Sequence, residues 1–394
     1  MLQNLSFAIR RFARPLLVVA SAGLATLSSA QDLRPIHVGV ILSLTGPSAA
    51  LGIPGNQALP LWGDKVGGQP LKLTVINDAS DSTQATTAAR RLIEENSVDV
   101  IIGPSYTPNS MAILPLLPEH KIAAISLAGG GAIVEPMDAT RKWSYKLSPT
   151  ETVATRLVFD HMKKSSSKTL GVVALSNAYG DGYLRVIGKL ADEYGIKVVT
   201  TERWGAADQA VMAQALKVIA SQPDAVFIVG PGTPAALPHV TLVQRGYKGT
   251  IYQTQGAASP DFLRVGGRDV EGALMAVAPI LVAEQLPADN PIRAVATDFV
   301  TRFEGKYGPG SRSVFGASAW DAMLLLQVAV PVALKTAKPG TPEFRSALRD
   351  ALEATKDAVG TAAVYTMSPT DHNGVDARSQ VLARIEGGQW KLVR

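Results

Sequence analysis

Short apolar runs alternate with helix-type stretches along most of the chain, and turn residues separate them. The runs at 36–42 (IHVGVIL), 98–102 and 169–175 are typical of buried parallel strands. Residues 82–95 and 151–162 instead carry apolar side chains at helical spacing. Asp81 or Ser82 is expected to cap the first helix, and residues 148–151 (SPTE) have a capping-box pattern that includes Glu151. Because this alternation repeats in both halves, the pattern predicts two doubly wound α/β sheets.

Residues 101–132 combine the features expected of a binding edge. A strand stops at Gly103, a helix follows that Thr107 is expected to cap with its hydroxyl, and a second strand ends at residues 128–131 (AGGG). The carboxyl ends of parallel strands share one edge, where open α/β sheets bind ligands. We therefore place the candidate site at this edge.

The remaining pattern predicts long helices and a mixed tail. Helices are expected from about Gly55 to Val66 and over 291–307, 314–335 and 342–354. Residues 273–280 are interpreted as a strand that returns to the first half of the fold. The tail from 361 to 394 is interpreted as a β-meander with a turn at residues 372–374.

Composition is compatible with two globular domains. The chain has 394 residues, of which 46% are hydrophobic and 18% charged, enough to bury two cores. Its net charge is +5, and three of its arginines lie before residue 15, so +5 − 3 leaves +2 for the rest. No basic stripe interleaved with aromatic residues is present, and we expect no nucleic-acid partner.

The first 30 residues have the pattern of a secretory signal peptide. A basic start precedes an apolar segment from Pro15 to about Leu27, and small residues lead to a cleavage point after about Ala30. A membrane anchor is the alternative, but the segment is shorter than the roughly 20 residues that span a bilayer. The sequence contains no cysteine, which excludes disulfides and a lipid-modified N-terminal cysteine.

Motifs for catalysis and metal binding are missing from the sequence. There is no HExxH, GxSxG, Walker-type loop or strand-following GxGxxG. The five histidines form no close pair, and residues 371–376 fit a plain hairpin turn better than a calcium loop. We therefore expect a protein that is not an enzyme and holds no cofactor or metal.

Four motifs, in this order, resemble the periplasmic leucine/isoleucine/valine-binding proteins, the type I solute receptors of ABC importers. They are residues 38–47 (VGVILSLTGP), 101–104 (IIGP), 178–182 (AYGDG) and 244–247 (QRGY). The resemblance covers nearly the whole chain after the leader, and it implies a periplasmic protein. It also implies the type I fold, two Rossmann-like lobes joined by three crossovers near Leu147, Val277 and Thr355.

The implied N-terminal lobe comprises 31–147 plus 277–355, and the C-terminal lobe comprises 148–276 plus 356–394. In the family, the loops matching 105–107 and 128–130 hold the ligand's carboxylate and amino groups, and the other lobe supplies a side chain that packs over it. The resemblance assigns these residues to the ligand: Leu51, Ser105, Tyr106, Thr107, Ala128, Gly129, Gly130, Tyr179, Gly232, Thr233 and Gln255.

Two of these positions depart from the family pattern. Gln255 stands where an acidic residue typically receives an ammonium group, and Gly130 replaces a hydroxyl residue. An unpaired buried ion costs several kcal/mol, on the order of the penalty measured for broken buried pairs. Neutral Gln255 cannot supply the missing charge, so an α-ammonium group is disfavoured.

The carboxylate end needs no basic residue, because a helix N-terminus offers free N–H groups and roughly half a positive charge. The Thr107 hydroxyl, the amides after it and those of 129–131 are the expected donors. Simpler interpretations stay open. In these, Thr107 only caps the helix, residues 129–131 form a flexible turn, Tyr179 belongs to the core, and Gln255 is a solvated loop amide.

The sequence thus predicts a solute receptor that closes by hinge motion around one small carboxylate ligand, such as an aromatic acid. Its expected partner is the membrane permease of an ABC importer, and we expect a monomer. A receptor for a branched-chain or other amino acid is the first alternative. A ligand-sensing domain for a signalling partner and an enzyme are the others.

Overall fold

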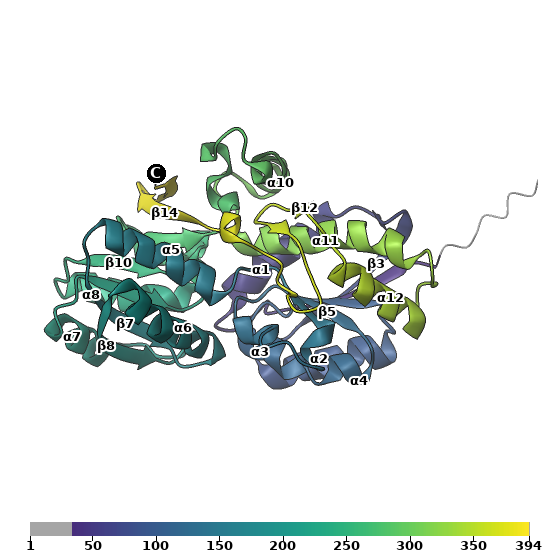
Figure 1. The fold of residues 1–394 in the computed structure, drawn as a ribbon, viewed down its shortest axis with the longest axis horizontal. Coiled ribbons are helices and arrows are strands. Elements are labelled where there is room, and N and C mark those ends of the chain that lie inside the picture. Colours follow the sequence, from purple (N-terminus) through teal and green to yellow (C-terminus); the bar gives the residue numbers. More distant parts are fainter. Residues whose placement is uncertain (1–33, 394) are drawn as a thin grey trace, which may run out of the picture. The chain divides into compact units, whose positions relative to one another are not determined.

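The computed structural model describes residues 34–393, so the predicted signal peptide lies outside the described residues. Two mixed sheets organise this part of the chain, as Figure 1 shows. The first sheet has the order β2-β3-β1-β4-β5-β6 and the second β15-β14-β11-β10-β9-β7-β8. The predicted α/β fold with two doubly wound sheets is confirmed.

The strands of the first sheet are parallel except where β2 pairs with β3. They are β1 (Ile36–Leu42), β2 (Lys65–Val66), β3 (Gln69–Asn77), β4 (Val100–Ile102), β5 (Ala123–Ser126) and β6 (Ser144–Lys146). Those of the second sheet are β7 (Thr169–Leu175), β8 (Lys197–Trp204), β9 (Ala225–Val229), β10 (Thr250–Gln253), β11 (Leu274–Val277), β14 (Val381–Glu386) and β15 (Gln389–Leu392). A separate pair is formed by β12 (Ala358–Val359) and β13 (Val364–Tyr365).

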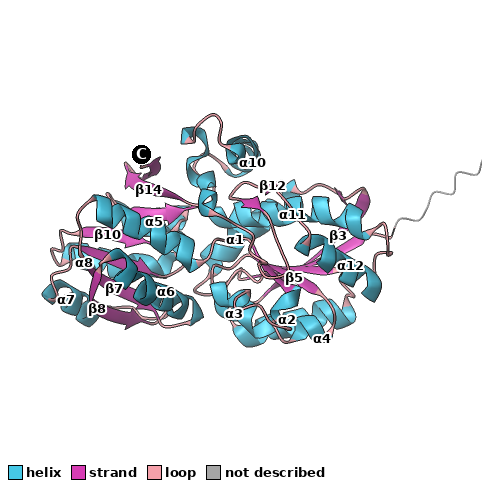
Figure 2. Cartoon of the chain, in the orientation of Figure 1, coloured by secondary structure: helices cyan, strands magenta, loops and turns pink. Residues whose placement is uncertain are grey.

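Helices cover the sheets, as Figure 2 shows. They are α1 (Ala49–Ala58), α2 (Ser82–Arg90), α3 (Thr107–Ile113), α4 (Leu116–Glu119), α5 (Glu151–Lys164), α6 (Ala178–Tyr194), α7 (Met212–Ala220), α8 (Ala236–Gln244), α9 (Pro260–Gly266), α10 (Pro291–Tyr307), α11 (Val314–Ala333) and α12 (Pro342–Glu353). Helix α1 begins six residues before the predicted start at Gly55. A Cβ at Gly52 would lie 2.1 Å from the Ser43 carbonyl oxygen, so only glycine lets α1 pack this closely against the end of β1.

Alternate strand residues supply the cores on opposite faces of each sheet. In β9, Phe227 and Val229 join one buried cluster, whereas Val226 and Ile228 join another. Strand β1 divides in the same way, with Val40 on one side and Ile41 on the other. This is the period of two expected of strands that are covered on both faces.

Two sequence predictions for the later chain differ from the structure. Strand β11 pairs with β10 and β14, so residues 274–277 belong to the second sheet, and the chain returns to the first sheet only after them. The tail is not a continuous meander: β14 and β15 form a hairpin whose turn holds Gly387 and Gly388, both with positive φ. Residues 372–374 form a separate loop.

Because of the contacts of that loop, the third crossover between the sheets lies later in the chain than its predicted place near Thr355. The His372 ring stacks on Tyr145 with centroids 4.3 Å apart, and Asn373 donates to the Lys146 carbonyl at 2.8 Å. The Thr361 N–H donates to buried Asp321 of α11 at 2.7 Å. Residues 358–375 therefore pack with the first sheet, and the chain joins the second sheet at Val381. The division into two mobile lobes stays a prediction.

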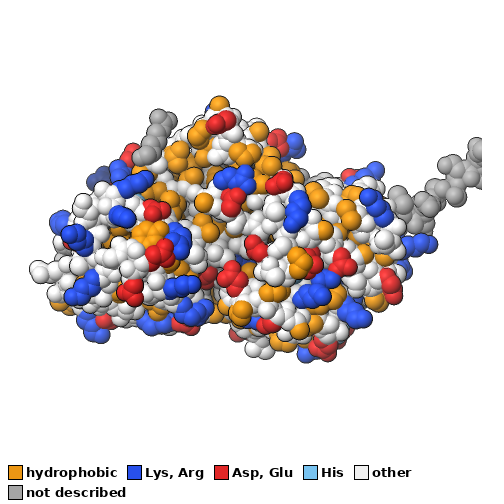
Figure 3. All heavy atoms as spheres, viewed as in Figure 1, with side chains coloured by type: hydrophobic (Ala, Val, Ile, Leu, Met, Phe, Trp, Pro, Cys, Tyr) orange, Lys and Arg blue, Asp and Glu red, His pale blue; other side chains and the backbone are white. Residues whose placement is uncertain are grey.

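Among the described residues, α11 is the one helix long and apolar enough to cross a membrane, and 72% of its most apolar window is buried within the protein. On the face drawn in Figure 3, basic and acidic side chains are interspersed over the surface. That face shows no single field of positive charge.

Candidate ligand-binding site

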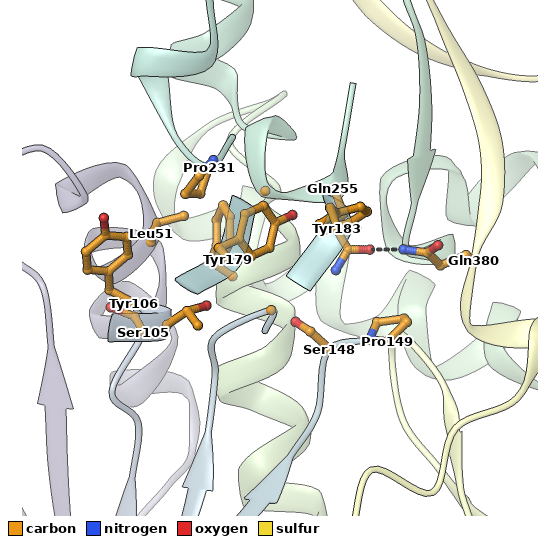
Figure 4. Close-up of a pocket in the computed structure, with 14 residues that line it drawn as sticks. Leu51, Ser105, Tyr106, Ser148, Pro149, Tyr179, Tyr183, Pro231, Gln255 and Gln380 are labelled. Atoms are coloured by element: carbon orange, nitrogen blue, oxygen red, sulfur yellow. Dashed lines mark hydrogen bonds between the residues drawn. The ribbon is translucent and has the colours of Figure 1, made fainter. Parts of the chain in front are cut away.

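A pocket lies where loops at the strand ends of the two sheets meet (Figure 4). It contains about 440 Å³ of space free of atoms, part of it open to solvent. Its lining comes from loops that follow strands of both sheets, from α1, α3, α6 and α11, and from the segment before β14. The lining residues are Leu51, Ser105, Tyr106, Thr107, Gly129, Ser148, Pro149, Tyr179, Tyr183, Pro231, Gln255, Gly256, Phe315 and Gln380.

Seven of the eleven residues expected from the sequence line this pocket, and four do not: Ala128, Gly130, Gly232 and Thr233. Gly130 lies behind the lining, where its N–H donates to the Thr107 hydroxyl oxygen at 3.1 Å. The N–H of Gly232 donates to the Gly256 carbonyl at 2.7 Å and so holds two second-sheet loops together.

Sequence reasoning missed the other seven lining residues, for different reasons. Tyr183 lies one helical turn after Tyr179, a spacing that could have revealed it. Pro231 and Gly256 are neighbours of predicted residues, and Ser148 and Pro149 belong to the crossover after β6. Phe315 and Gln380 come from distant parts of the chain, and no local signal marks them.

The Thr107 hydroxyl does not cap α3, contrary to the prediction. The cap position is held by Tyr106, without a side-chain hydrogen bond, and the Thr107 hydroxyl accepts the Gly130 N–H instead. A Cβ at Gly130 would lie 2.4 Å from Thr107 Cγ2, so only glycine lets the two loops approach this closely. Because Thr107 accepts a hydrogen bond there, its own proton remains free to donate.

Neutral donors gather at the first-sheet side of the pocket. The Ser105 hydroxyl accepts the Ser43 N–H at 3.1 Å, which leaves its proton available. In the glycine loop, the Gly130 and Gly131 amides have protein partners, whereas the Gly129 N–H has none among the described residues. Helix α3 has only seven residues, so hydroxyl and amide donors matter more here than its dipole. No lysine or arginine lines the pocket.

Aromatic side chains form the walls, among them Tyr106, Tyr179, Tyr183 and Phe315. The rings of Tyr179 and Tyr183 lie 5.1 Å apart between centroids. A Cβ at Gly129 would lie 2.8 Å from the Tyr179 ring, so the glycine loop lies directly against it. Burial raises the pKa of Tyr179 to about 12, and the phenol stays neutral at physiological pH.

Tyr106 connects the two sides of the pocket. Its phenol oxygen accepts a hydrogen bond from the Asn177 amide at 2.8 Å. Asn177 also caps α6, because its side-chain oxygen accepts the Gly180 N–H. One side chain thus links the loop after β4 to the start of a second-sheet helix.

Glu151 does not take part in the predicted capping box. It is 4% exposed, and its two carboxylate oxygens accept the Gly131 N–H at 2.9 and 3.0 Å. The Glu151 carboxylate also acts on the nearby, fully buried Lys146. Burial lowers the pKa of Lys146 to about 8, whereas the negative charge of Glu151 acts to raise that pKa. Glu151 is absent from the pocket lining and has partners of its own.

Gln255 is a pocket residue, so its interpretation as a solvated loop amide is wrong. The residue is 7% exposed, and its side-chain oxygen accepts a hydrogen bond from the Gln380 amide nitrogen at 3.3 Å. The position therefore holds a buried neutral amide. Within residues 34–393, no three histidine or acidic side chains are arranged to hold a metal ion.

Comparison with known proteins defines the class. The sequence matches the family described as periplasmic binding protein over residues 35–389. The chain belongs to this family, whose members are ligand-binding receptors.

Individual relatives agree with that assignment. An extracellular ligand-binding receptor from Rhodopseudomonas palustris is 41% identical, with 92% of this chain and 100% of that chain covered and a TM-score of 0.89. The leucine-binding protein LivK from Thermotoga maritima is 23% identical, with 91% and 98% covered and a TM-score of 0.78, which shows the shared fold. A Leu/Ile/Val-binding protein homologue from Brucella melitensis is 21% identical over 61% of this chain and 66% of its own length.

Proposed function

We propose that this protein is the periplasmic receptor of an ABC importer and that it binds a small carboxylate, such as an aromatic acid, between its two sheets. The observation that carries the proposal is the buried, uncharged Gln255 across the pocket from the hydroxyl-bearing loops. The similarity to an extracellular ligand-binding receptor over the whole length of that protein supports the receptor class.

The donors on the first-sheet side suit a carboxylate. Ser105, Thr107 and the Gly129 N–H each have a proton to donate, and such hydrogen bonds strengthen when the acceptor is charged. Closure around the ligand would exclude water and strengthen these contacts further. We infer that the carboxylate is bound here without any cationic side chain.

The walls suit a flat apolar body between the two ends. Tyr179, Tyr183 and Phe315 line the pocket, and aromatic rings favour another aromatic group in offset or edge-to-face contact. A ligand with this shape would leave the periplasm through the membrane permease that the receptor serves. A receptor of this class opens and closes by hinge motion, with the bound state favoured by contacts on both sides.

The second candidate is an amino-acid receptor, and Glu151 is the observation that favours it. Its carboxylate is next to the glycine loop and could receive an ammonium group if it released Gly131. The candidate requires a change of partner, because both oxygens now accept the Gly131 N–H.

Isothermal titration calorimetry with benzoate, phenylacetate and leucine tests the proposal. We expect micromolar or tighter binding of at least one aromatic acid and no heat with leucine. Micromolar leucine binding without any response to aromatic acids would refute the proposal. Glu151→Gln separates the candidates further: an ammonium site at Glu151 would lose leucine, whereas the proposed carboxylate site would keep its aromatic acid.

A further inference from the structure

Two buried glutamines meet in the pocket from segments 125 residues apart. Gln255 begins the turn after β10, and Gln380 directly precedes β14. The two residues are 7% and 6% exposed, and the Gln380 amide nitrogen donates to the Gln255 amide oxygen (Figure 4). Both line the pocket, so the pair forms part of the surface that a ligand meets.

The hydrogen bond fixes which end of Gln255 faces the ligand. A side-chain amide has one oxygen and one NH₂ group, and the Gln255 oxygen is held by Gln380. Figure 4 shows the Gln255 nitrogen on the Ser148 side, away from Gln380. Among the described residues, no protein acceptor takes its N–H groups. The pocket therefore presents a donor where the family resemblance implies an acceptor.

Gln380 contributes a second free group. Its amide oxygen is buried and has no hydrogen-bond partner among the described residues. A buried polar atom without a partner costs free energy, and a bound ligand or water commonly supplies that partner. The pair thus offers one donor, from Gln255, and one acceptor, from Gln380.

We propose that Gln380 is a positioning residue that turns the Gln255 amide nitrogen toward the ligand, and that the pair selects carboxylates whose far end carries a neutral oxygen. This inference rests on the proposed function and narrows its ligand class. A hydroxyl group fits best, because it accepts from Gln255 and donates to Gln380. An ether oxygen fits the donor alone. An ammonium group could donate to the Gln380 oxygen, but it would face the Gln255 N–H groups and find no negative charge in the pair.

Titration calorimetry with four probes tests the inference: benzoate and its 4-hydroxy, 4-methoxy and 4-aminomethyl derivatives, with the matching phenylacetates as a longer series. For the unaltered protein we expect the hydroxy and methoxy acids to bind at least tenfold more tightly than the aminomethyl acid. Equal affinity for the aminomethyl acid would overturn the inference.

Two substitutions at Gln380 test the positioning role. Gln380→Met keeps the length of the side chain and removes its amide, so we expect the tenfold preference to fall below threefold while affinity for unsubstituted benzoate stays within about twofold. Gln380→Glu places an acceptor beside Gln255, which should turn its amide around and shift the preference toward the aminomethyl acid. Thermal melts check that both variants fold.

The outcomes separate this inference from the proposed function. If benzoate binds but neither substitution changes the preference, Gln380 has no positioning role and the inference fails alone. If none of the aromatic acids binds and leucine does, the proposed function fails and this inference with it.

Discussion

The two sides of the pocket are built in different ways. On the first-sheet side, one continuous stretch supplies Ser105, Thr107 and Gly129. The Thr107 hydroxyl accepts the Gly130 N–H of the same stretch, and the Ser105 hydroxyl accepts an N–H from the loop after β1. On the second-sheet side, Gln255, Gln380 and the rings of Tyr179 and Tyr183 come from segments far apart in the chain. The first side offers hydrogen-bond donors that suit a carboxylate, whereas the second side offers aromatic walls and a pair of uncharged amides.

We infer from this difference that the two sides of the pocket have separate roles, one in the affinity for a carboxylate and the other in the choice between ligands. A carboxylate can be held by hydroxyl and main-chain donors whose positions follow from where two neighbouring strands end. In the proposed complex, the far end of the ligand contacts side chains that are held by packing and one hydrogen bond. We expect substitutions on the first side to remove binding and substitutions on the second to change which ligand is preferred.

The largest effect is expected from Gly130→Ala. The new Cβ would lie 2.4 Å from Thr107 Cγ2, although the backbone φ of −70° suits alanine. Overpacking of this kind costs about 1–3 kcal/mol, so calorimetry should show up to roughly 100-fold weaker carboxylate binding.

A second substitution makes this test specific. Thr107→Ser removes the clashing Cγ2 and keeps the hydroxyl, so the double variant Gly130→Ala/Thr107→Ser should recover most of the affinity. Gly188→Ala, at an exposed helical position with open space around it, is the matched control and should bind normally. An unaffected Gly130→Ala variant would show that the contact between the loops is irrelevant to binding.

Thr107→Ala is expected to have the next largest effect. It removes the acceptor for Gly130 and one donor to the ligand, and the loss of a hydrogen bond to a charged group costs about 1–2 kcal/mol, or roughly 5- to 30-fold in Kd. Thr107→Ser should bind within about twofold of the unaltered protein. An unchanged dissociation constant for Thr107→Ala would remove this residue from the site.

Tyr106→Phe should have the smallest effect, because it breaks one contact between the two sides and leaves the aromatic wall intact. Loss of the bond from Asn177 should weaken every bound carboxylate by a similar factor, about fivefold, or roughly 1 kcal/mol. Tyr307→Phe removes a comparable hydroxyl, bonded to the Gln57 carbonyl outside the pocket, and should not alter binding. A change of ligand preference in Tyr106→Phe would contradict the proposed division of roles.

The sequence predicted the fold and the first-sheet side of the pocket better than the second-sheet side. Strand periodicity and the glycine-rich loop are local patterns, so they suffice to place residues 101–132 at one edge of a sheet. Two predictions from local patterns were wrong. Thr107 was expected to cap a helix and Glu151 to take part in a capping box, but each side chain accepts an N–H from the glycine loop instead. Such long-range partners compete with local caps, and the sequence does not reveal which prevails.

Phe315 and Gln380 could not be identified as pocket residues from the sequence. Each comes from a segment whose own pattern predicts only a helix or a strand boundary, and the tertiary fold alone brings it to the pocket. The predicted crossover near Thr355 failed for a similar reason, because the His372 ring and the Asn373 amide hold residues after it against the first sheet.

A crystal structure of the protein with its tightest-binding aromatic acid tests the central claim most directly. The account predicts the carboxylate within hydrogen-bond distance of the Ser105 and Thr107 hydroxyls and the Gly129 N–H, with the other end of the ligand at the Gln255 amide nitrogen. A carboxylate bound at Gln255, or a ligand held by Glu151 instead, would contradict it.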